Sequence, residues 1–538
     1  MRRPDLVRRC LTLSLSGLLS RGSGFVFVVA LAACTRATPA PTPSARTIGS
    51  AVVPIPQTVD IASRDSFLVT PRTVVYIDAN ASPEIQAIGD YTANLLASRA
   101  GATAQRLSTA NAPDSSVTLS LDASRTSLGA EGYELTATRT GVHIVAAQPA
   151  GVFYGVQTLR QLLPVSVEHQ ASYTRRLIMP AAHVVDVPRF AWRGGMLDVS
   201  RHFLPAADVK RFVDLYALYK LNRLHLHLSD DQGWRIEIKS WPRLTELSGH
   251  TAIGDEPAGF YTQAEYADIV AYARSRYITV VPEIDMPGHI NSALLAYPDL
   301  KCDRVAPPPF TRVGGPPNSL CVTRDSIYGF VADVVREISS AAPTPYFHIG
   351  GDEVRGMSKE DYASFVTHVQ QIVTSIGPRM VGWGEIAPVN ISPTTIVQHW
   401  TNDSVVVHAR RGGQIIMSPG PHAYLDMKYD SSSSLGLQWA GLINLQRAYD
   451  WDPATLVPGV AESSVLGVEG PLWAETLLTR QDYEYMAFPR LAALAELGWS
   501  PASKLNWNDF RARMAVQGAR LAAMGVNFAR VPGVDWKW

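Results

Sequence analysis

Two adjacent carboxylates, Asp352 and Glu353, are the residues of this chain whose types and spacing best suit acid–base chemistry. They follow a short apolar segment, residues 346–349, and the pair Gly350-Gly351. A strand alternates its side chains between two faces, and glycine permits backbone geometry that a β-carbon forbids, so a strand end of this kind can direct both carboxylates into one pocket. Two carboxylates held close together cannot both ionise freely, which drives one toward the protonated form that an acid catalyst requires. The alternative is a helix N-cap, in which an acidic pair follows a glycine-rich turn.

The elements that must position these residues are short apolar segments that alternate with helical patterns from residue 190 onward. Alternation on this scale predicts parallel β/α units. Polar residues follow nearly every predicted strand, and a barrel gathers all its strand ends around one mouth, whereas an open sheet gathers its ligands at one switch point. The sequence therefore predicts a (β/α)8 TIM barrel over residues 187–538. The expected strands are 192–199, 224–228, 278–284, 346–349, 380–383, 395–400, 415–417 and 465–468, and the expected helices include 206–219, 262–276, 328–340, 358–376, 483–497 and 507–524.

The residues at the predicted strand ends are mostly acids and aromatics. Carboxylates and arginine bind sugar hydroxyls, and flat aromatic faces stack on the C–H surfaces of a pyranose, so this set predicts a carbohydrate pocket. No phosphate loop and no Gly-x-Ser-x-Gly elbow occurs, and we expect no cofactor. The strand-end residues are Arg201, Asp230, Asp231, Asp285, His289, Asp352, Glu353, Trp383, Glu385, Trp400, Tyr424, Asp426, Trp473 and Glu475.

Length and charge limit the remaining classes of function. The chain has 538 residues, enough for a barrel of about 250 residues or more and a smaller domain. Lys and Arg together number 48, as do Asp and Glu, so the net charge is zero and no basic stripe for nucleic acid is present. Residues 51–186 alternate β-like and helical segments with few clustered acids or histidines, which predicts an N-terminal α+β accessory domain.

The N-terminus reads as a targeting segment. Residues 1–33 have a basic start and an apolar stretch that is too short to span a bilayer, as in a signal peptide. Leu31-Ala32-Ala33-Cys34 resembles a bacterial lipobox, in which Cys34 becomes the lipidated N-terminus. An ordinary signal peptide cleaved nearby is the alternative. Residues 34–50 have the composition of a linker. We expect an exported protein, periplasmic or on the outer surface, that contacts a membrane only through this lipid anchor.

The two cysteines beyond the leader and the lipobox, Cys302 and Cys321, are expected to close a Pro/Gly-rich loop as a disulfide, with two buried thiols as the alternative. His225 and His227 share one face of a predicted strand. They could be metal ligands, as in metal-dependent amidohydrolase barrels, but no further ligand set matches that chemistry. We therefore expect barrel-layer histidines and no metal.

Four motifs together resemble one enzyme family. His348-Ile349-Gly350-Gly351-Asp352-Glu353 is similar to the His-x-Gly-Gly-Asp-Glu signature of glycoside hydrolase family 20, the exo-β-N-acetylhexosaminidases. Segments 196–203, 225–235 and 286–289 resemble the first three barrel strands of that family and the polar residues after them. The resemblance extends from about residue 52 to the C-terminus, and it includes the accessory domain.

The resemblance implies a role for each matching residue. Glu353 would protonate the glycosidic oxygen and then activate water, and Asp352 would orient the 2-acetamido group of the substrate. The acetamido oxygen attacks C1 in this family, so that no carboxylate nucleophile is needed. Asp230 and His289 would form a hydrogen-bonded chain behind Glu353 that tunes its proton affinity. The remaining binding residues implied are Tyr424 on the acetamido oxygen, Arg201, Asp426 and Glu475 on the hydroxyls, and Trp383, Trp400 and Trp473 as walls.

Other interpretations of the same residues stay open. Asp198 is expected to be structural, Asp231 to cap a turn, and Asp285 to bind either the substrate region or the backbone near Pro287-Gly288. His348 is expected to support its neighbours. For the whole chain, the alternatives are a lacto-N-biosidase-type activity on the same scaffold and a non-catalytic glycan-binding lipoprotein. The proline-rich loop 303–318 leaves the preference for the leaving group open.

Overall fold

The computed structural model describes residues 51–78, 80–100, 103–107, 114–168, 176–255 and 258–537. The predicted signal peptide, the linker and Cys34 lie outside the described residues. None of the helices described there has the length and apolarity needed to cross a bilayer.

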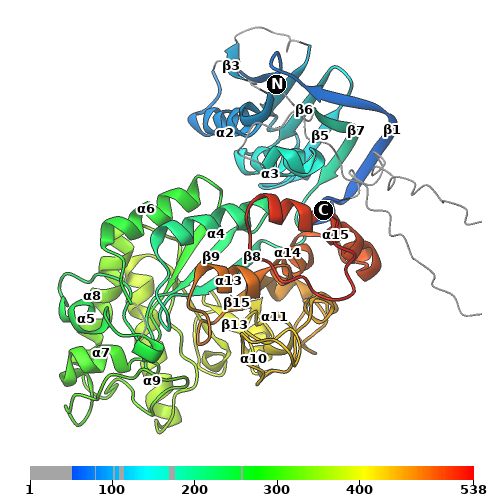
Figure 1. Cartoon of the computed structure of the whole chain (residues 1–538). Helices are drawn as coiled ribbons and strands as arrows, with labels where there is room; N and C mark the ends of the chain where they lie inside the picture. The colour runs from blue at the N-terminus through cyan, green and yellow to red at the C-terminus, as the bar shows by residue number, and fades with distance from the viewer. Residues whose placement is uncertain are drawn as a thin grey trace, which may run out of the picture. The chain divides into compact units, whose positions relative to one another are not determined.

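Eight parallel strands close into a barrel in the order β10-β11-β12-β13-β14-β15-β8-β9, which confirms the predicted TIM barrel (Figure 1). The register of neighbouring strands brings their carboxyl ends to one side; Glu283 of β10 pairs with His348 of β11, for example. Side chains after those ends can therefore meet although they are far apart in sequence. The strands are β8 (Trp192–Asp198), β9 (Arg223–His227), β10 (Thr279–Glu283), β11 (Tyr346–His348), β12 (Arg379–Trp383), β13 (Ile396–His399), β14 (Gln414–Met417) and β15 (Val465–Leu472).

Helices cover the outside of the barrel, and their sequences show why they form. Helix α8 buries Ile327, Phe330, Val331 and Val334, which recur at helical spacing on one face. Helix α6 begins at the predicted capping box, in which Thr262 accepts from the Glu265 N–H. The helices are α4 (Ala206–Leu218), α5 (Arg243–Ser248), α6 (Gln263–Arg274), α7 (Asn291–Ala296), α8 (Ser326–Ala341), α9 (Lys359–Ile376), α10 (Val405–Arg410), α11 (Gly420–Ala423), α12 (Leu445–Tyr449), α13 (Arg480–Ala487), α14 (Arg490–Trp499) and α15 (Trp507–Ala523).

One predicted helix is wrong. The sequence predicts one continuous helix over 483–497, but the structure divides this segment between α13 and α14 at Phe488 and Pro489. Proline has no backbone N–H to donate and its ring collides with the preceding turn, so a proline in the interior of a helix kinks or breaks it.

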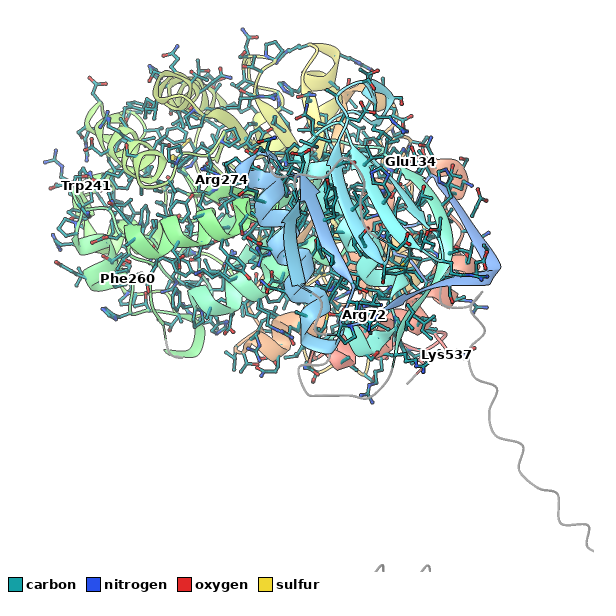
Figure 2. All side chains as sticks on the ribbon, turned by 90° about the horizontal axis from the view of Figure 1, so that it is seen from above. Arg72, Glu134, Trp241, Phe260, Arg274 and Lys537 are labelled. Atoms are coloured by element: carbon teal, nitrogen blue, oxygen red, sulfur yellow. A yellow bond between two sulfur atoms is a disulfide. The ribbon has the colours of Figure 1, made fainter. Side chains whose placement is uncertain are left out.

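The N-terminal part forms a mixed sheet of seven strands in the order β1-β7-β5-β6-β4-β2-β3. Tyr133 and Leu135 of β5 are buried, whereas Glu134 lies on the opposite, partly exposed face of the sheet (Figure 2). This is the α+β accessory domain that the sequence predicts. Its elements are β1 (Thr58–Val69), β2 (Val74–Asp78), α2 (Pro83–Ala100), β3 (Thr103–Leu107), β4 (Ser116–Leu121), β5 (Tyr133–Ala137), β6 (Gly141–Ala146), α3 (Pro149–Leu162) and β7 (Leu177–Asp186).

Candidate active site

The carboxylate pair follows β11 through a turn that only glycine can make. Gly350 and Gly351 have φ of 66° and 98°, and Glu353 also has a positive φ, 50°. A β-carbon on Gly350 would lie 1.7 Å from Asp285 Oδ1. The next helix, α9, begins only at Lys359 and has Ser358 as its N-cap, so the pair is not a helix cap.

The two carboxylates face the same histidine from different depths. His289 Nε2 lies 3.8 Å from Asp352 Oδ2 and 3.6 Å from Glu353 Oε2. The Asp352 side chain is 13% exposed and that of Glu353 is 45% exposed. Behind the histidine, His289 Nδ1 lies 3.3 Å from Asp230 Oδ1, and Asp230 pairs with Arg201 at 2.7 Å. The result is a line of charged groups that runs from Arg201 to the rim.

The electrostatics of the pair differ from the sequence-based expectation that crowding favours the protonated form of the acid catalyst. Burial raises the pKa of Asp352, although the nearby His289 partly opposes this shift. The His289 imidazole instead lowers the pKa of Glu353, which is better solvated. Burial opposes a charge on His289, but Asp230 and the other acids around it raise its pKa well above the usual value. In the free protein, therefore, the deep carboxyl is the one driven toward protonation.

A buried carboxylate that the sequence analysis missed, Glu283 of β10, organises the floor of the site. Its Oε1 accepts from Trp383 Nε1 at 2.8 Å and lies 3.0 Å from His348 Nδ1. Its Oε2 lies 2.5 Å from His227 Nδ1 and 3.1 Å from His225 Nε2. In the sequence, the only sign of this role of Glu283 is its position as a charged residue within an apolar strand segment.

His225 and His227 are oriented by carboxylates in the barrel interior, as expected of barrel-layer histidines. His225 Nδ1 is 2.8 Å from Glu469 Oε1, and the acids around the ring raise the pKa of His225 to about 9 against the opposing effect of burial. His227 Nε2 is 2.8 Å from Asp230 Oδ2. Both rings are thus parts of the hydrogen-bonded floor beneath the pocket.

Arg201, Asp426 and Glu475 are buried with polar atoms unused. Arg201 Nε, both carboxylate oxygens of Asp426 and Glu475 Oε2 have no hydrogen-bond partner among the described residues. Burial raises the pKa of Asp426 well above the usual value, and the neighbouring Glu475 adds to this shift. Buried polar groups are normally hydrogen-bonded, so these atoms suit a ligand that carries several hydroxyls.

Asp198 holds this part of the site in place, as the sequence suggested. Its Oδ1 accepts from the backbone N–H groups of Ser200 and Arg201 at 2.8 and 3.1 Å, and its Oδ2 accepts from Ala474 N–H at 3.0 Å. Asp231 and Asp285 also bind backbone, though not where expected: Asp231 Oδ1 accepts from Asn291 N–H, and Asp285 Oδ1 accepts from Gly351 N–H at 3.1 Å.

Aromatic rings form the walls. Trp383 and Trp473 have ring centroids 5.8 Å apart, and Trp400 stacks on Tyr424 at 6.1 Å with an interplanar angle of 21°. Trp439, which the sequence analysis did not select, meets Trp400 and Tyr424 edge-on and is 55% exposed. An exposed aromatic next to a polar pocket suits the C–H face of a second sugar ring.

The proline-rich loop lies at the rim beside Glu353. Cys302 and Cys321 form a disulfide that closes this loop. Pro316, Pro317 and Asn318 line a small pocket together with His289, Glu353 and Arg355. The loop therefore narrows the mouth on the side of Glu353.

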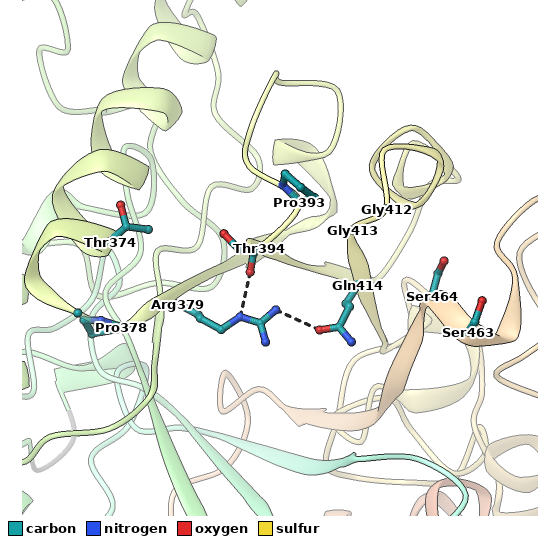
Figure 3. A pocket seen from close by; sticks show the side chains of 11 residues that line it. Thr374, Pro378, Arg379, Pro393, Thr394, Gly412, Gly413, Gln414, Ser463 and Ser464 are labelled. Atoms are coloured by element: carbon teal, nitrogen blue, oxygen red, sulfur yellow. Dashed lines mark hydrogen bonds between the residues drawn. The ribbon is translucent and has the colours of Figure 1, made fainter.

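A larger cavity of about 720 Å³ lies elsewhere and does not carry the chemistry (Figure 3). It is lined by residues at the amino ends of strands, including Arg379 of β12 and Gln414 of β14. Arg379 donates to the Thr394 carbonyl and to Gln414 Oε1, both at 3.0 Å (Figure 3). TIM-barrel active sites lie at the carboxyl ends of the strands, where the acids and aromatic rings are.

Comparisons with known proteins agree with this geometry. The family model described as glycosyl hydrolase family 20, catalytic domain, matches residues 190–502, and the model of domain 2 of that family matches residues 49–187. A β-N-acetylhexosaminidase of Cellulomonas fimi is 40% identical over 490 residues, which cover 90% of this chain and 97% of the relative.

Solved structures show the same likeness. The family 20 β-N-acetylhexosaminidase of Streptomyces coelicolor A3(2) has a TM-score of 0.87 and 43% identity, and the alignment covers 93% of this chain and 100% of that one. A mutant Streptomyces plicatus β-hexosaminidase in complex with its product GlcNAc has a TM-score of 0.87 and 45% identity, with 93% and 99% covered.

Proposed function

We propose that this chain, which belongs to glycosyl hydrolase family 20 and is therefore a glycoside hydrolase, acts as a retaining exo-β-N-acetylhexosaminidase. It releases terminal β-GlcNAc from chitooligosaccharides or glycans, with β-GalNAc as the alternative terminal sugar. The observation that carries this proposal is the different depth of the two adjacent carboxylates: Asp352 is nearly buried, whereas Glu353 is at the open rim. A terminal sugar bound in the pocket then has its acetamido group at Asp352 and its leaving group at Glu353.

The nucleophile in this scheme is the substrate's own acetamido oxygen, which attacks C1 and forms an oxazolinium ion. Asp352 accepts from the acetamido N–H and stabilises the positive charge that develops on the amide. The Tyr424 hydroxyl holds the carbonyl oxygen. Trp383, Trp400 and Trp473 confine the acetamido group, which keeps its oxygen close to C1 and reduces the entropy that the attack costs.

Glu353 transfers the proton. It first protonates the glycosidic oxygen and later removes a proton from the water that opens the intermediate. Its pKa is lowered in the free protein by His289, but a bound sugar displaces water from the rim. Loss of that solvation favours the neutral acid, so substrate binding itself raises the proton affinity of Glu353. Asp230 keeps His289 charged and oriented toward Glu353. The charge on His289 limits how far substrate binding can raise the pKa of Glu353.

Hydroxyl recognition falls to Arg201, Asp426 and Glu475. Their unused buried atoms match the several donors and acceptors of a terminal pyranose. A sugar that lacks one of these hydroxyls leaves a buried polar group without a partner, which costs about 1 to 3 kcal/mol or more. Recognition of the free hydroxyls of a terminal pyranose supports cleavage from the non-reducing end of the glycan.

The test is an assay of the purified protein on aryl β-GlcNAc, with the anomer of the first product followed by NMR. The proposal predicts rapid cleavage and β-GlcNAc as the initial product. A lacto-N-biosidase-type enzyme would cleave an aryl lacto-N-bioside and leave aryl β-GlcNAc intact, and a glycan-binding lipoprotein would cleave neither. An α-anomer as the first product would contradict retention.

We also propose that residues 1–33 are removed on export and that Cys34 carries a lipid. Metabolic labelling with a tritiated fatty acid tests this directly. Label should enter the wild-type protein and be absent from Cys34→Ser.

A further inference from the structure

Glu385 is a carboxylate that the proposed mechanism leaves unused. It lies in a short 3-10 helix, η5 (Gly384–Ile386), directly after β12, and it faces the residue that follows β13. The Trp400 indole N–H donates to both of its oxygens, at 3.0 Å to Oε2 and 3.2 Å to Oε1. Trp400 in turn stacks on Tyr424, so Glu385 supports the aromatic wall from behind.

The other side of Glu385 faces a cavity of about 460 Å³ that is distinct from the sugar pocket in its lining. Val354, Met357, Pro388 and Val389 give this cavity an apolar character. Tyr362 of α9 also lines it and donates its hydroxyl to the Gly351 carbonyl at 2.6 Å. Glu385 therefore contacts the Trp400 indole and also lines this second cavity.

We propose that Glu385 is a positioning residue for the reaction: its carboxyl holds Trp400 flat against Tyr424 and exchanges its proton through the cavity behind. The inference rests on the proposed function, because Tyr424 and Trp400 matter only if they confine the acetamido group. A wall that tilts lets the acetamido oxygen move away from C1, and a misplacement of about 1 Å can cost on the order of 100-fold in rate.

Several titratable groups surround Glu385. Asp352 and Glu353 act on it from the turn after β11, the Tyr362 hydroxyl of α9 lies close to it, and Lys359 of α9 lines the same cavity. Burial and the nearby Asp352 raise the pKa of Glu385 to about 7, while the Trp400 hydrogen bond opposes the shift. Glu385 is therefore neutral in mildly acidic solution and ionises as the pH rises through about 7. A carboxylate accepts a hydrogen bond roughly twice as strongly as a neutral group, so Trp400 is held more firmly above that pH.

The experiment compares Glu385→Ala and Glu385→Gln with Glu360→Gln, a matched control at an exposed acid of α9. Glu385→Ala removes the acceptor and should lower kcat on aryl β-GlcNAc by about 10-fold or more, with a smaller change in KM, because the wall matters most as the oxygen approaches C1. Glu385→Gln keeps an acceptor for the indole and should restore most of that loss at pH 5.5. Glu360→Gln should behave as the wild type.

A spectroscopic titration separates this role from a general loss of stability. Tryptophan fluorescence of the wild-type protein should change with an inflection near pH 7 as a charge forms beside the Trp400 indole. The same step should be present in Glu360→Gln and absent from Glu385→Gln and from Trp400→Phe. An unchanged kcat in Glu385→Ala, or a persistent step in Glu385→Gln, would overturn the proposal. If the wild-type protein failed to cleave aryl β-GlcNAc, the proposed function would fail first, and the titration would still report on the Glu385–Trp400 contact.

Discussion

His289 Nε2 lies 3.6 Å from Glu353 Oε2, while the other nitrogen of the same ring lies 3.3 Å from Asp230 Oδ1. One imidazole thus connects a buried carboxylate to the carboxylate at the rim. Because Asp230 is anionic and buried, it keeps His289 charged, and the charged ring favours the anion of Glu353. The acidity of the rim carboxyl is therefore set from inside the barrel.

Replacement of His289 should move the pH profile. In His289→Gln the charge that lowers the pKa of Glu353 is lost, so this pKa rises, and the protonated acid survives to higher pH. The alkaline limb of kcat/KM should shift upward, measured on a substrate whose leaving group needs protonation. His250→Gln, at an exposed histidine, is the control and should leave the limb in place. If the alkaline limb of kcat/KM does not move in His289→Gln, the charge on His289 does not control the pKa of Glu353.

Glu353→Gln should discriminate between leaving groups. An acid catalyst contributes about 10² to 10⁴-fold, and only poor leaving groups depend on it in the first step. Cleavage of chitobiose should almost cease, whereas a dinitrophenyl glycoside should retain much more of its rate. Equal losses on both substrates would remove Glu353 from the role of acid.

Asp352→Asn should slow formation of the cyclic intermediate by about 10²-fold or more, because an amide cannot balance the positive charge on the acetamido group. The pKa of Asp352 is raised, so wild-type activity should also fall as the pH falls through that pKa and the carboxylate becomes neutral. Single-turnover kinetics of the wild type and the variant across pH give both results. If the cyclic intermediate forms at the same rate in Asp352→Asn as in the wild type, the Asp352 carboxylate takes no part in its formation.

Gly350→Ala should lower kcat/KM by more than its effect on the free energy of unfolding would suggest. The new β-carbon would lie 1.7 Å from Asp285 Oδ1, at a φ of 66° that side chains rarely adopt. The turn that carries Asp352 and Glu353 must shift, and kcat/KM should fall by about 100-fold. Gly356→Ala is the matched control: its φ is 75°, but nothing lies within 4 Å of the new β-carbon. Gly356→Ala should lower the free energy of unfolding by only about 1 to 2 kcal/mol, which is the backbone strain of a positive φ, and kcat/KM should stay near normal.

The disulfide should contribute to stability through the unfolded chain. Cys302 and Cys321 are 19 residues apart, and closure of a loop of this size is worth about 3 kcal/mol. The double variant Cys302→Ser/Cys321→Ser should lower the free energy of unfolding by about that amount in urea denaturation. Because the loop lines the rim near Glu353, KM for chitooligosaccharides should rise more than KM for an aryl glycoside. Equal changes in both KM values would mean that the rim does not touch the leaving group.

The sequence was most informative where a strand ends and a polar residue follows. Asp352 and Glu353 could be assigned to the mouth of a barrel because a parallel β/α pattern brings all such ends together. Pro489 carried a signal that should have divided the predicted helix 483–497, since a proline in the interior of a helix kinks or breaks it.

Other features depended on contacts between distant residues. Glu283 and Glu469 reach histidines at positions 225, 227 and 348, and no local pattern announces such pairs. The direction of the pKa shifts within the Asp352–Glu353 pair follows from depth and from His289, which the order of residues does not reveal. Trp439 needed the three-dimensional arrangement for the same reason, and so did the contact between Glu385 and the Trp400 indole.

The most direct test of the central claim is the ratio of kcat/KM for aryl β-GlcNAc to that for the matching aryl β-glucoside, which lacks only the acetamido group. If the amide of the substrate is the nucleophile, the ratio should be at least about 10³, since intramolecular attack is what lowers the barrier. Comparable rates on the two substrates would contradict the account.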